Sequence, residues 1–301
     1  MGESLLTETV DGFQIDIYQD EYPENPRGWG NLGHMVCWHS RYNLGDEQRS
    51  DSQEDFFREL AEIVDDTVAD RIEYWENGKG YKSIFNWCER EFPDMHWMDW
   101  PISRYVDERV MDIIDNTIKK YYIMLPLALY DHSGITMYVG SSSHSMDPGG
   151  WDSGQVGWIF VSQEQIRKEY GWKVLTKKRI EKIKEYLANE VKTYDQYLTG
   201  CVYGCAITER ATCKYCGAEL EAEIETVGGY FGDIDDIMKE VKSIIPDLKS
   251  VFGDRTCQRY KALLSALKLE NDLFDTVNLC EGAEYALAGR LDARMGGGTH
   301  D

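Results

Sequence analysis

The chain has 301 residues, of which 54 are acidic and 32 basic, so its formal net charge at pH 7 is −22. A surface this negative repels phosphate backbones, anionic lipid and acidic substrates at long range, which disfavours direct binding to nucleic acid or to a membrane. Hydrophobic residues make up 42% and aromatic residues 12% of the chain, and this composition predicts a folded protein and not a disordered acidic one.

The acidic excess is unevenly distributed. Residues 1–120 carry 27 acidic and 12 basic residues, residues 121–200 carry nine of each, and residues 201–301 carry 18 and 11. Such an asymmetry suggests an acidic surface that meets a basic partner. The alternative is an ordinary acidic surface that only keeps the protein in solution.

The N-terminal residues lack the basic region and the apolar run of a signal peptide. The longest apolar run, residues 121–130, is about half of the roughly 20 residues needed to cross a bilayer. These features predict a soluble protein of the cytoplasm. In that compartment the eight cysteines are expected to be reduced or bound to metal.

In the first half of the chain, residues 13–18 (FQIDIY) alternate in polarity and predict a strand. A long loop rich in Pro, Gly and Asn follows. Helical spacing, with Ser52 as a cap, then predicts a first helix through Phe56, Phe57, Leu60 and Ile63, and further helices at 67–76 and 106–120. Residues 87–100 show no clean period.

The second half alternates short strands with separate helices. Strands are predicted at 121–130, 135–139 and 155–161, helices at 163–170, 177–193 and 234–245, and a hairpin at 201–226 around the sequence CKYC. The mixture indicates the α+β class, with a small central mixed or antiparallel sheet surrounded by helices. Residues 1–245 are expected to form the core domain, 246–295 a C-terminal helical extension, and 296–301 a disordered tail.

Four segments together resemble a family of proteins found in tailed phages, prophages and plasmids. The segments are YPENPRGWGNLGHMVCWHSRYNLGD, LPLALYDHSGITM, WDSGQVGWIFVS and EVKTYDQYLTGCVYG. The resemblance covers roughly residues 13–235, and the chain departs from the family pattern at the CKYC turn and in its C-terminal extension. No activity is agreed for the family. The resemblance implies a mobile-element protein inside the host cell, where accessory proteins often counteract host defence.

The sequence Cys213-Lys-Tyr-Cys216-Gly has the form of a zinc knuckle, in which one turn directs two thiolates at an ion. Cys201 and Cys205 lie on one predicted strand, roughly 13 Å apart if extended, so at most one of them can join the same site. Cys257 or Cys280 can supply a fourth ligand. A structural zinc is therefore one hypothesis, and free thiols with a coincidental spacing are the other. A redox pair is disfavoured because it usually opens a helix.

Residues suited to catalysis occur in three loops. His34, Cys37 and His39 lie in the first loop; Asp131, His132 and Ser133 end a predicted strand; Asp152 and Ser153 precede another strand. A nucleophile–His–Asp arrangement can be assembled from these types, with Asp131, His132, Asp152 and Ser153 as the candidates. The alternative is a set of polar turns, since Asp-His-Ser-Gly is also a favourable turn sequence.

Acidic residues alternate along the second strand of the predicted hairpin. Glu219, Glu221, Glu223 and Glu225 are expected on one face of it, and Asp233, Asp235 and Asp236 follow closely. A row of carboxylates can imitate the phosphate charges of DNA and occupy a basic groove. A solvated strand face is the alternative.

The sequence therefore leaves three hypotheses open. The preferred one is a phage or mobile-element accessory protein, not an enzyme, that inhibits a host anti-phage defence complex by covering its DNA-binding surface. The second is a hydrolase of small substrates or nucleic acid with a site around His132 and Asp152. The third is a structural module stabilised by zinc at Cys213, Cys216, Cys201 and Cys257. The aromatic content also suggests a homo-oligomer.

Overall fold

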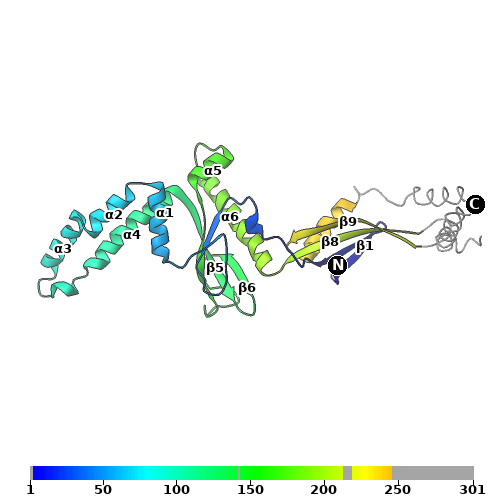
Figure 1. Cartoon of the computed structure of the whole chain (residues 1–301), viewed down its shortest axis with the longest axis horizontal. Helices are drawn as coiled ribbons and strands as arrows, with labels where there is room; N and C mark the ends of the chain where they lie inside the picture. Colours follow the sequence, from blue (N-terminus) through cyan, green and yellow to red (C-terminus); the bar gives the residue numbers. More distant parts are fainter. Residues whose placement is uncertain (1–2, 142, 213–218, 246–301) are drawn as a thin grey trace, which may run out of the picture. The chain divides into compact units, whose positions relative to one another are not determined.

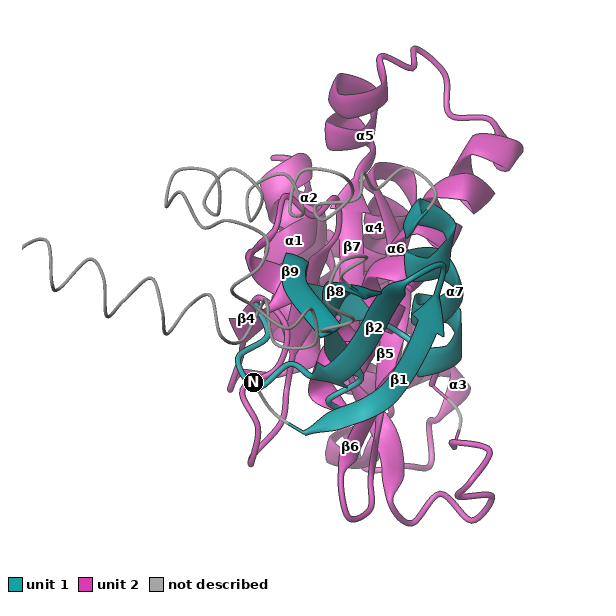
Figure 2. Ribbon diagram, turned by 90° about the vertical axis from the view of Figure 1, so that its right-hand side faces the viewer, with its two compact units in different colours: residues 1–24, 200–301 teal, residues 25–199 magenta. Residues whose placement is uncertain are grey.

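The computed structural model describes residues 3–141, 143–212 and 219–245 (Figure 1). The chain divides into two compact units, which Figure 2 colours separately. Unit 1 consists of Met1–Glu24 and Gly200–Asp301, and unit 2 consists of Asn25–Thr199. Unit 2 is therefore an insertion between two segments of unit 1.

Unit 1 contains a four-stranded antiparallel sheet in the order β1-β2-β8-β9. Its strands are β1 (Ser4–Val10), β2 (Phe13–Gln19), β8 (Val202–Thr212) and β9 (Glu219–Phe231). Alternate residues of β2 are buried, and they pack with apolar residues of helix α7 (Ile234–Ile244). The helix therefore covers one face of the sheet and leaves the other face without a helix of this unit among the described residues.

Unit 2 contains a five-stranded mixed sheet in the order β4-β3-β7-β5-β6. Only β3 and β4 pair in parallel, and the other neighbours are antiparallel. The strands are β3 (His34–Cys37), β4 (Glu47–Gln48), β5 (Tyr122–Asp131), β6 (Ile135–Val139) and β7 (Ser153–Ser162). The two central strands, β7 and β5, supply most of its buried residues.

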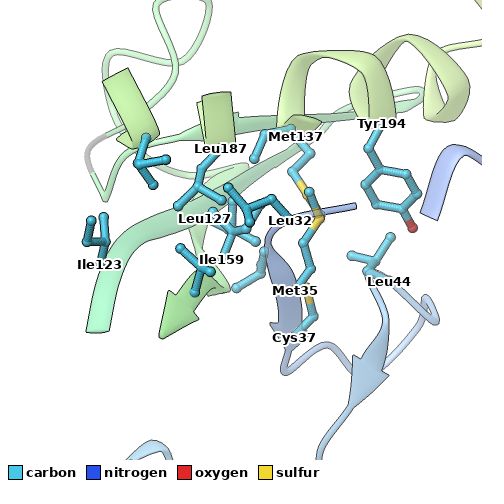
Figure 3. Close-up of a cluster of buried hydrophobic side chains, with 14 of the residues drawn as sticks. Leu32, Met35, Cys37, Leu44, Ile123, Leu127, Met137, Ile159, Leu187 and Tyr194 are labelled. Carbon is cyan, nitrogen blue, oxygen red and sulfur yellow. The ribbon is translucent and has the colours of Figure 1, made fainter. Parts of the chain in front are cut away.

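One face of this sheet packs against helices α5 (Gln163–Tyr170) and α6 (Lys177–Leu198). Apolar residues spaced by three or four along α6, such as Ile183, Leu187 and Val191, are buried there. Figure 3 shows Leu187 among Ile159, Leu127 and other side chains of this cluster. The amphipathic helix predicted for residues 177–193 is therefore confirmed.

The other face packs against a helical layer. Alternate residues of β7 separate the two cores, because Ile159 and Val161 join the α6 side while Phe160 joins the helical layer. The layer contains α1 (Gln53–Val64), α2 (Val68–Glu76), α3 (Lys79–Glu91) and α4 (Ile102–Tyr121). Two 3₁₀ turns, η1 (Pro26–Gly28) and η2 (Trp97–Asp99), lie in the connecting segments.

The α+β prediction is confirmed, with two sheets in place of one central sheet. The sequence analysis missed β1, β3, β4 and α3. The predicted C-terminal extension (246–295) and tail (296–301) lie outside the described residues. Within the described part of the chain, no helix combines the length and the apolar character needed to cross a membrane.

Candidate functional site

The glutamates of β9 form the acidic site that the sequence analysis favours. Glu219, Glu221, Glu223 and Glu225 are all exposed, and the intervening Leu220, Ala222 and Ile224 are half-buried. This alternation follows from the strand period of two residues. The register with β8 shifts between Ile207 and Thr208, so Glu223 pairs with Thr208 whereas Glu225 pairs with Ile207, which is buried in the cluster that contains α7. The expectation that all four glutamates share one face is therefore wrong: Glu219, Glu221 and Glu223 lie on the outer face, and Glu225 lies on the α7 side.

The residues opposite these glutamates on β8 are short or basic. Glu219, Glu221 and Glu223 pair with Thr212, Arg210 and Thr208, respectively. Arg210 Nη2 lies 2.8 Å from Glu221 Oε1, and both side chains are about half exposed. An ion pair this exposed stabilises the fold by about 1 kcal/mol or less, so it leaves Glu221 accessible to a partner.

The aspartates that begin α7 have a local structural role. Asp233 caps the helix by accepting a hydrogen bond from the Asp235 backbone N–H at 2.9 Å. Asp236 accepts from Lys239 Nζ at 2.7 Å, and this hydrogen bond lowers the Asp236 pKa below its ordinary value. Carboxylates at a helix N-terminus also interact favourably with the helix dipole. The cap, the contact with Lys239 and the helix dipole therefore account for acidic residues at these positions without a partner protein.

The structure brings His132 and Asp152 together at the ends of β5 and β7. His132 Nδ1 lies 2.9 Å from Asp152 Oδ2, and both side chains are well exposed. The His132 ring stacks on Tyr130, and Tyr130 also stacks on His144 with ring centroids 4.9 Å apart. A His–Asp pair of this geometry can orient an imidazole for proton transfer.

Ser153 is directed to a different carboxylate. Its hydroxyl donates to Asp147 Oδ2 at 2.7 Å, and Asp147 also accepts from the backbone N–H groups of Trp151 and Asp152. These contacts, the Ser153 hydrogen bond first, lower the pKa of Asp147. Asp147 therefore organises the turn before β7, and Ser153 takes part in that turn.

Asp131 lies beside the His132–Asp152 pair, because its backbone N–H donates to the Asp152 carbonyl oxygen at 2.9 Å, but its carboxylate has other partners. Asp131 forms an ion pair with Arg41 and accepts a hydrogen bond from the Tyr42 hydroxyl at 3.4 Å. His34 lies on β3 beside Glu47. Cys37 is fully buried, and burial raises the pKa of its thiol to about 12, so almost none of it is thiolate at neutral pH.

The cysteines named as zinc ligands are only partly described. Cys201 is half-buried just before β8, whereas Cys205 is buried in the core, and burial raises its pKa to about 11. Cys213, Cys216, Cys257 and Cys280 lie outside the described residues. Among residues 3–141, 143–212 and 219–245, no group of three or more His, Cys, Asp or Glu side chains is placed to hold a metal ion.

A buried ionic cluster in unit 2 was missed by the sequence analysis. The Arg27 guanidinium donates to Asp46 at 2.6 and 2.9 Å, to Glu190 at 3.1 Å and to the Gly33 carbonyl at 2.7 Å. Glu190 in turn accepts from the backbone N–H groups of Leu32 and Gly33. The side chains of Arg27 and Glu190 are 4% and 7% exposed. Arg27 and Glu190 are far apart along the chain, in the first loop and in α6, so no local sequence pattern indicates that they pair.

Comparison of the chain with protein-family models, with curated proteins and with solved structures finds no match.

Proposed function

We propose that the chain is an accessory protein of a phage or other mobile element that binds a basic surface of a host defence complex and inhibits it. The observation that carries the proposal is the exposed row of glutamates on β9. The resemblance described above supports the setting inside a host cell. In this proposal the outer face of the unit 1 sheet occupies a surface that otherwise binds DNA.

The charge on this face extends beyond β9. Asp16 on β2 pairs with Ala206 of β8, and Thr208 pairs with Glu223, so Asp16 and Glu223 lie on the same face of the sheet. Alternate residues of a strand are roughly 6.8 Å apart, whereas one DNA strand carries a charge about every 3.4 Å along the axis. The row is thus sparser than DNA, and charge from neighbouring strands is needed to approach it.

Some acidic residues of unit 2 already have basic partners within the protein. Arg49 lies within 3.1 Å of Glu47, Asp51 and Glu59, and Arg58 lies 2.6 Å from Glu76. Carboxylates that already have such partners gain less from a second basic group. This difference favours β9 over the carboxylates around Arg49 and Arg58 as the contact surface.

The test begins with capture of the partner. The tagged full chain is used to capture proteins from a bacterial lysate at low and high salt, and the captured protein is purified. The variant E219Q/E221Q/E223Q/E225Q should then bind it about tenfold more weakly, which corresponds to about 1.4 kcal/mol. The affinity should also depend less on salt, because fewer counterions exchange on binding.

A matched control removes the same charge from another surface. The variant E54Q/E62Q/E169Q/E185Q changes four exposed glutamates of α1, α5 and α6. It should bind the partner with nearly unchanged affinity, and both variants should keep the melting temperature of the parent chain. Equal weakening by the two variants would show that net charge, and not the β9 face, determines binding.

The His132–Asp152 contact at 2.9 Å supports hydrolysis as a second candidate function. In that case H132A and D152N should each abolish a hydrolytic activity found by screening small esters, phosphoesters and oligonucleotides. S153A should lower that activity much less, because the Ser153 hydroxyl bonds to Asp147. An activity that survives H132A would exclude this site.

A further inference from the structure

The segment between α3 and α4 displays three large apolar side chains to solvent. Met95, Trp97 and Met98 are 44%, 54% and 70% exposed, within four consecutive positions of unit 2. Exposed apolar side chains that occur singly need no explanation, but several large ones within one short segment favour an interaction site. Trp and Met are also among the residue types enriched at protein interfaces.

The segment is held in place by its aromatic neighbours. Trp100 Nε1 donates to the Phe92 carbonyl oxygen at 3.2 Å, which closes the segment across eight residues. The Trp100 ring contacts Phe85 edge to face at 5.1 Å, and Trp87 makes edge contacts with Phe92 and Tyr105. These rings anchor both ends of the segment to α3, and Trp87 joins α3 to α4.

The short turn within the segment has its own cap. The Met98 backbone N–H donates to His96 Nδ1 at 3.3 Å, at the start of η2. The exposed side chains of Trp97 and Met98 are therefore displayed from backbone that is already ordered. Less conformational entropy is lost when a preorganised segment binds than when a flexible one does.

The charges around the cluster restrict what can cover it. Glu89, Glu91, Asp94 and Asp99 are all exposed within the same stretch. Anionic lipid headgroups would be repelled by these carboxylates. A second copy of the chain docked through the same segment would bring like charges together. A partner protein with basic groups around an apolar pocket would avoid both repulsions.

We propose that residues 92–100 are a docking segment that inserts Trp97 and Met98 into an apolar pocket of a partner protein, with Lys or Arg side chains at the rim of that pocket. The rim residues contact Asp94 and Asp99. This site is separate from the glutamates of β9, and the proposal does not require them.

The first experiment places a photo-crosslinker at the cluster. Trp97 of the full chain is replaced by p-benzoylphenylalanine, the protein is irradiated in a bacterial lysate, and the crosslinked peptides are sequenced by mass spectrometry. We expect one main adduct whose partner peptide contains apolar residues flanked by Lys or Arg. The same replacement at Tyr186, an exposed ring of α6, should not form that adduct.

The second experiment uses the purified crosslinked partner. W97A/M98A should weaken binding by tenfold or more, and D94N/D99N should weaken it less and reduce its salt dependence. Because these side chains are exposed, both variants should keep the parent melting temperature. E219Q/E221Q/E223Q/E225Q serves as a comparison, since its failure to weaken binding would contradict the proposed function and leave the docking segment intact.

Several results would overturn the docking proposal. They are an adduct only to the chain itself, no adduct at Trp97 beyond that at Tyr186, or unchanged affinity of W97A/M98A. Binding of the full chain to neutral or anionic lipid vesicles that W97A/M98A abolishes would also overturn it, because it would assign the cluster to a membrane.

Discussion

Gly157 shows how tightly single positions of the unit 2 sheet are packed. It lies on β7 between Cys37 of β3 and Leu127 of β5. A Cβ atom at this position would lie 2.2 Å from the Val36 carbonyl oxygen and 3.0 Å from the Cys37 Cα. The nearest obstacle is backbone, which cannot move aside as a flexible side chain can.

We therefore expect G157A to lower the free energy of unfolding by about 3 kcal/mol or more, through overpacking. G154A is the matched control on the same strand, because nothing lies within 4 Å of a Cβ there, and it should change stability by about 0.5 kcal/mol or less. Urea denaturation of both variants measures the difference. Similar losses in the two would contradict the packing described here.

Asp195 is a carboxylate of α6 whose environment disfavours its charge. Its Oδ1 accepts from the Met137 backbone N–H at 2.7 Å, and burial raises its pKa above the ordinary value of 3.8. Because the folded-state pKa exceeds the unfolded one, the charged group costs stability at neutral pH. That cost disappears as the pH falls through the folded pKa toward the ordinary value.

D195N keeps the acceptor oxygen and removes the charge. We expect the variant to melt at a higher temperature than the parent chain at pH 7, and the difference to shrink as the pH falls to 4 and below. Melting curves over this range check the sign. A variant less stable than the parent at pH 7 would show that the charge is stabilised by contacts beyond the Met137 N–H.

At the scale of elements, the Arg27 cluster attaches the first loop to α6. The Arg27 side chain is buried with Glu190, and it bonds also to Asp46 before β4. Removal of one partner from a buried ionic cluster leaves the others charged and unpaired, which typically costs 3–5 kcal/mol. Exposed ion pairs contribute about 0–1 kcal/mol.

R27A should accordingly lower the free energy of unfolding by about 3–5 kcal/mol. R41A breaks the ion pair with Asp131, in which the Arg41 side chain is 65% exposed, and it should cost about 1 kcal/mol or less. Chemical denaturation of the two arginine variants compares a buried cluster with an exposed pair. A loss below about 1 kcal/mol in R27A would show that the loop is held by its apolar contacts alone.

The zinc hypothesis concerns Cys213 and Cys216, which lie between β8 and β9 in the sequence. If Cys213 and Cys216 bind a structural zinc, the purified full chain should contain about one zinc per molecule, and a chelator should lower its melting temperature. C213S/C216S should lose both the metal and the response to the chelator. Metal-free protein with an unchanged melting curve would favour free thiols.

At the scale of the whole molecule, the insertion of unit 2 into unit 1 is the main organisational feature. Each unit has its own sheet and its own buried cluster, and unit 2 is one continuous segment, Asn25–Thr199. Domains with separate cores can unfold as separate cooperative steps.

Residues 25–199 expressed alone are expected to fold, with far- and near-ultraviolet circular dichroism and a cooperative melting curve. L187A, a fully buried core change in unit 2, should destabilise this fragment by about 2–5 kcal/mol. I237A changes a residue in the buried cluster of unit 1. In the full chain it should lower the melting temperature of unit 1 and leave the unfolding transition of unit 2 unchanged. A fragment without cooperative unfolding would show that unit 2 depends on the rest of the chain.

Sequence reasoning succeeded where a local period was strong. The strand at residues 13–18, the strands at 121–130 and 155–161 and the helix at 177–193 are confirmed, because burial on one or both faces imposes a period on the residues. It missed β3 because Pro, Gly and Asn surround His34–Cys37. It missed α3, although Gly80, Ile84, Trp87 and Cys88 recur at helical spacing, because residues 87–100 show no period when they are taken as one stretch.

The sequence by itself determined the acidity of the chain, the α+β class and the alternation of glutamates in residues 219–225, since each follows from composition or from short-range periodicity. The tertiary structure decided what those residues meet. It placed His132 beside Asp152, directed Ser153 to Asp147, and buried Arg27 with Glu190. These contacts join residues that are distant along the chain, and only the packing of the sheets and helices fixes the distances between them.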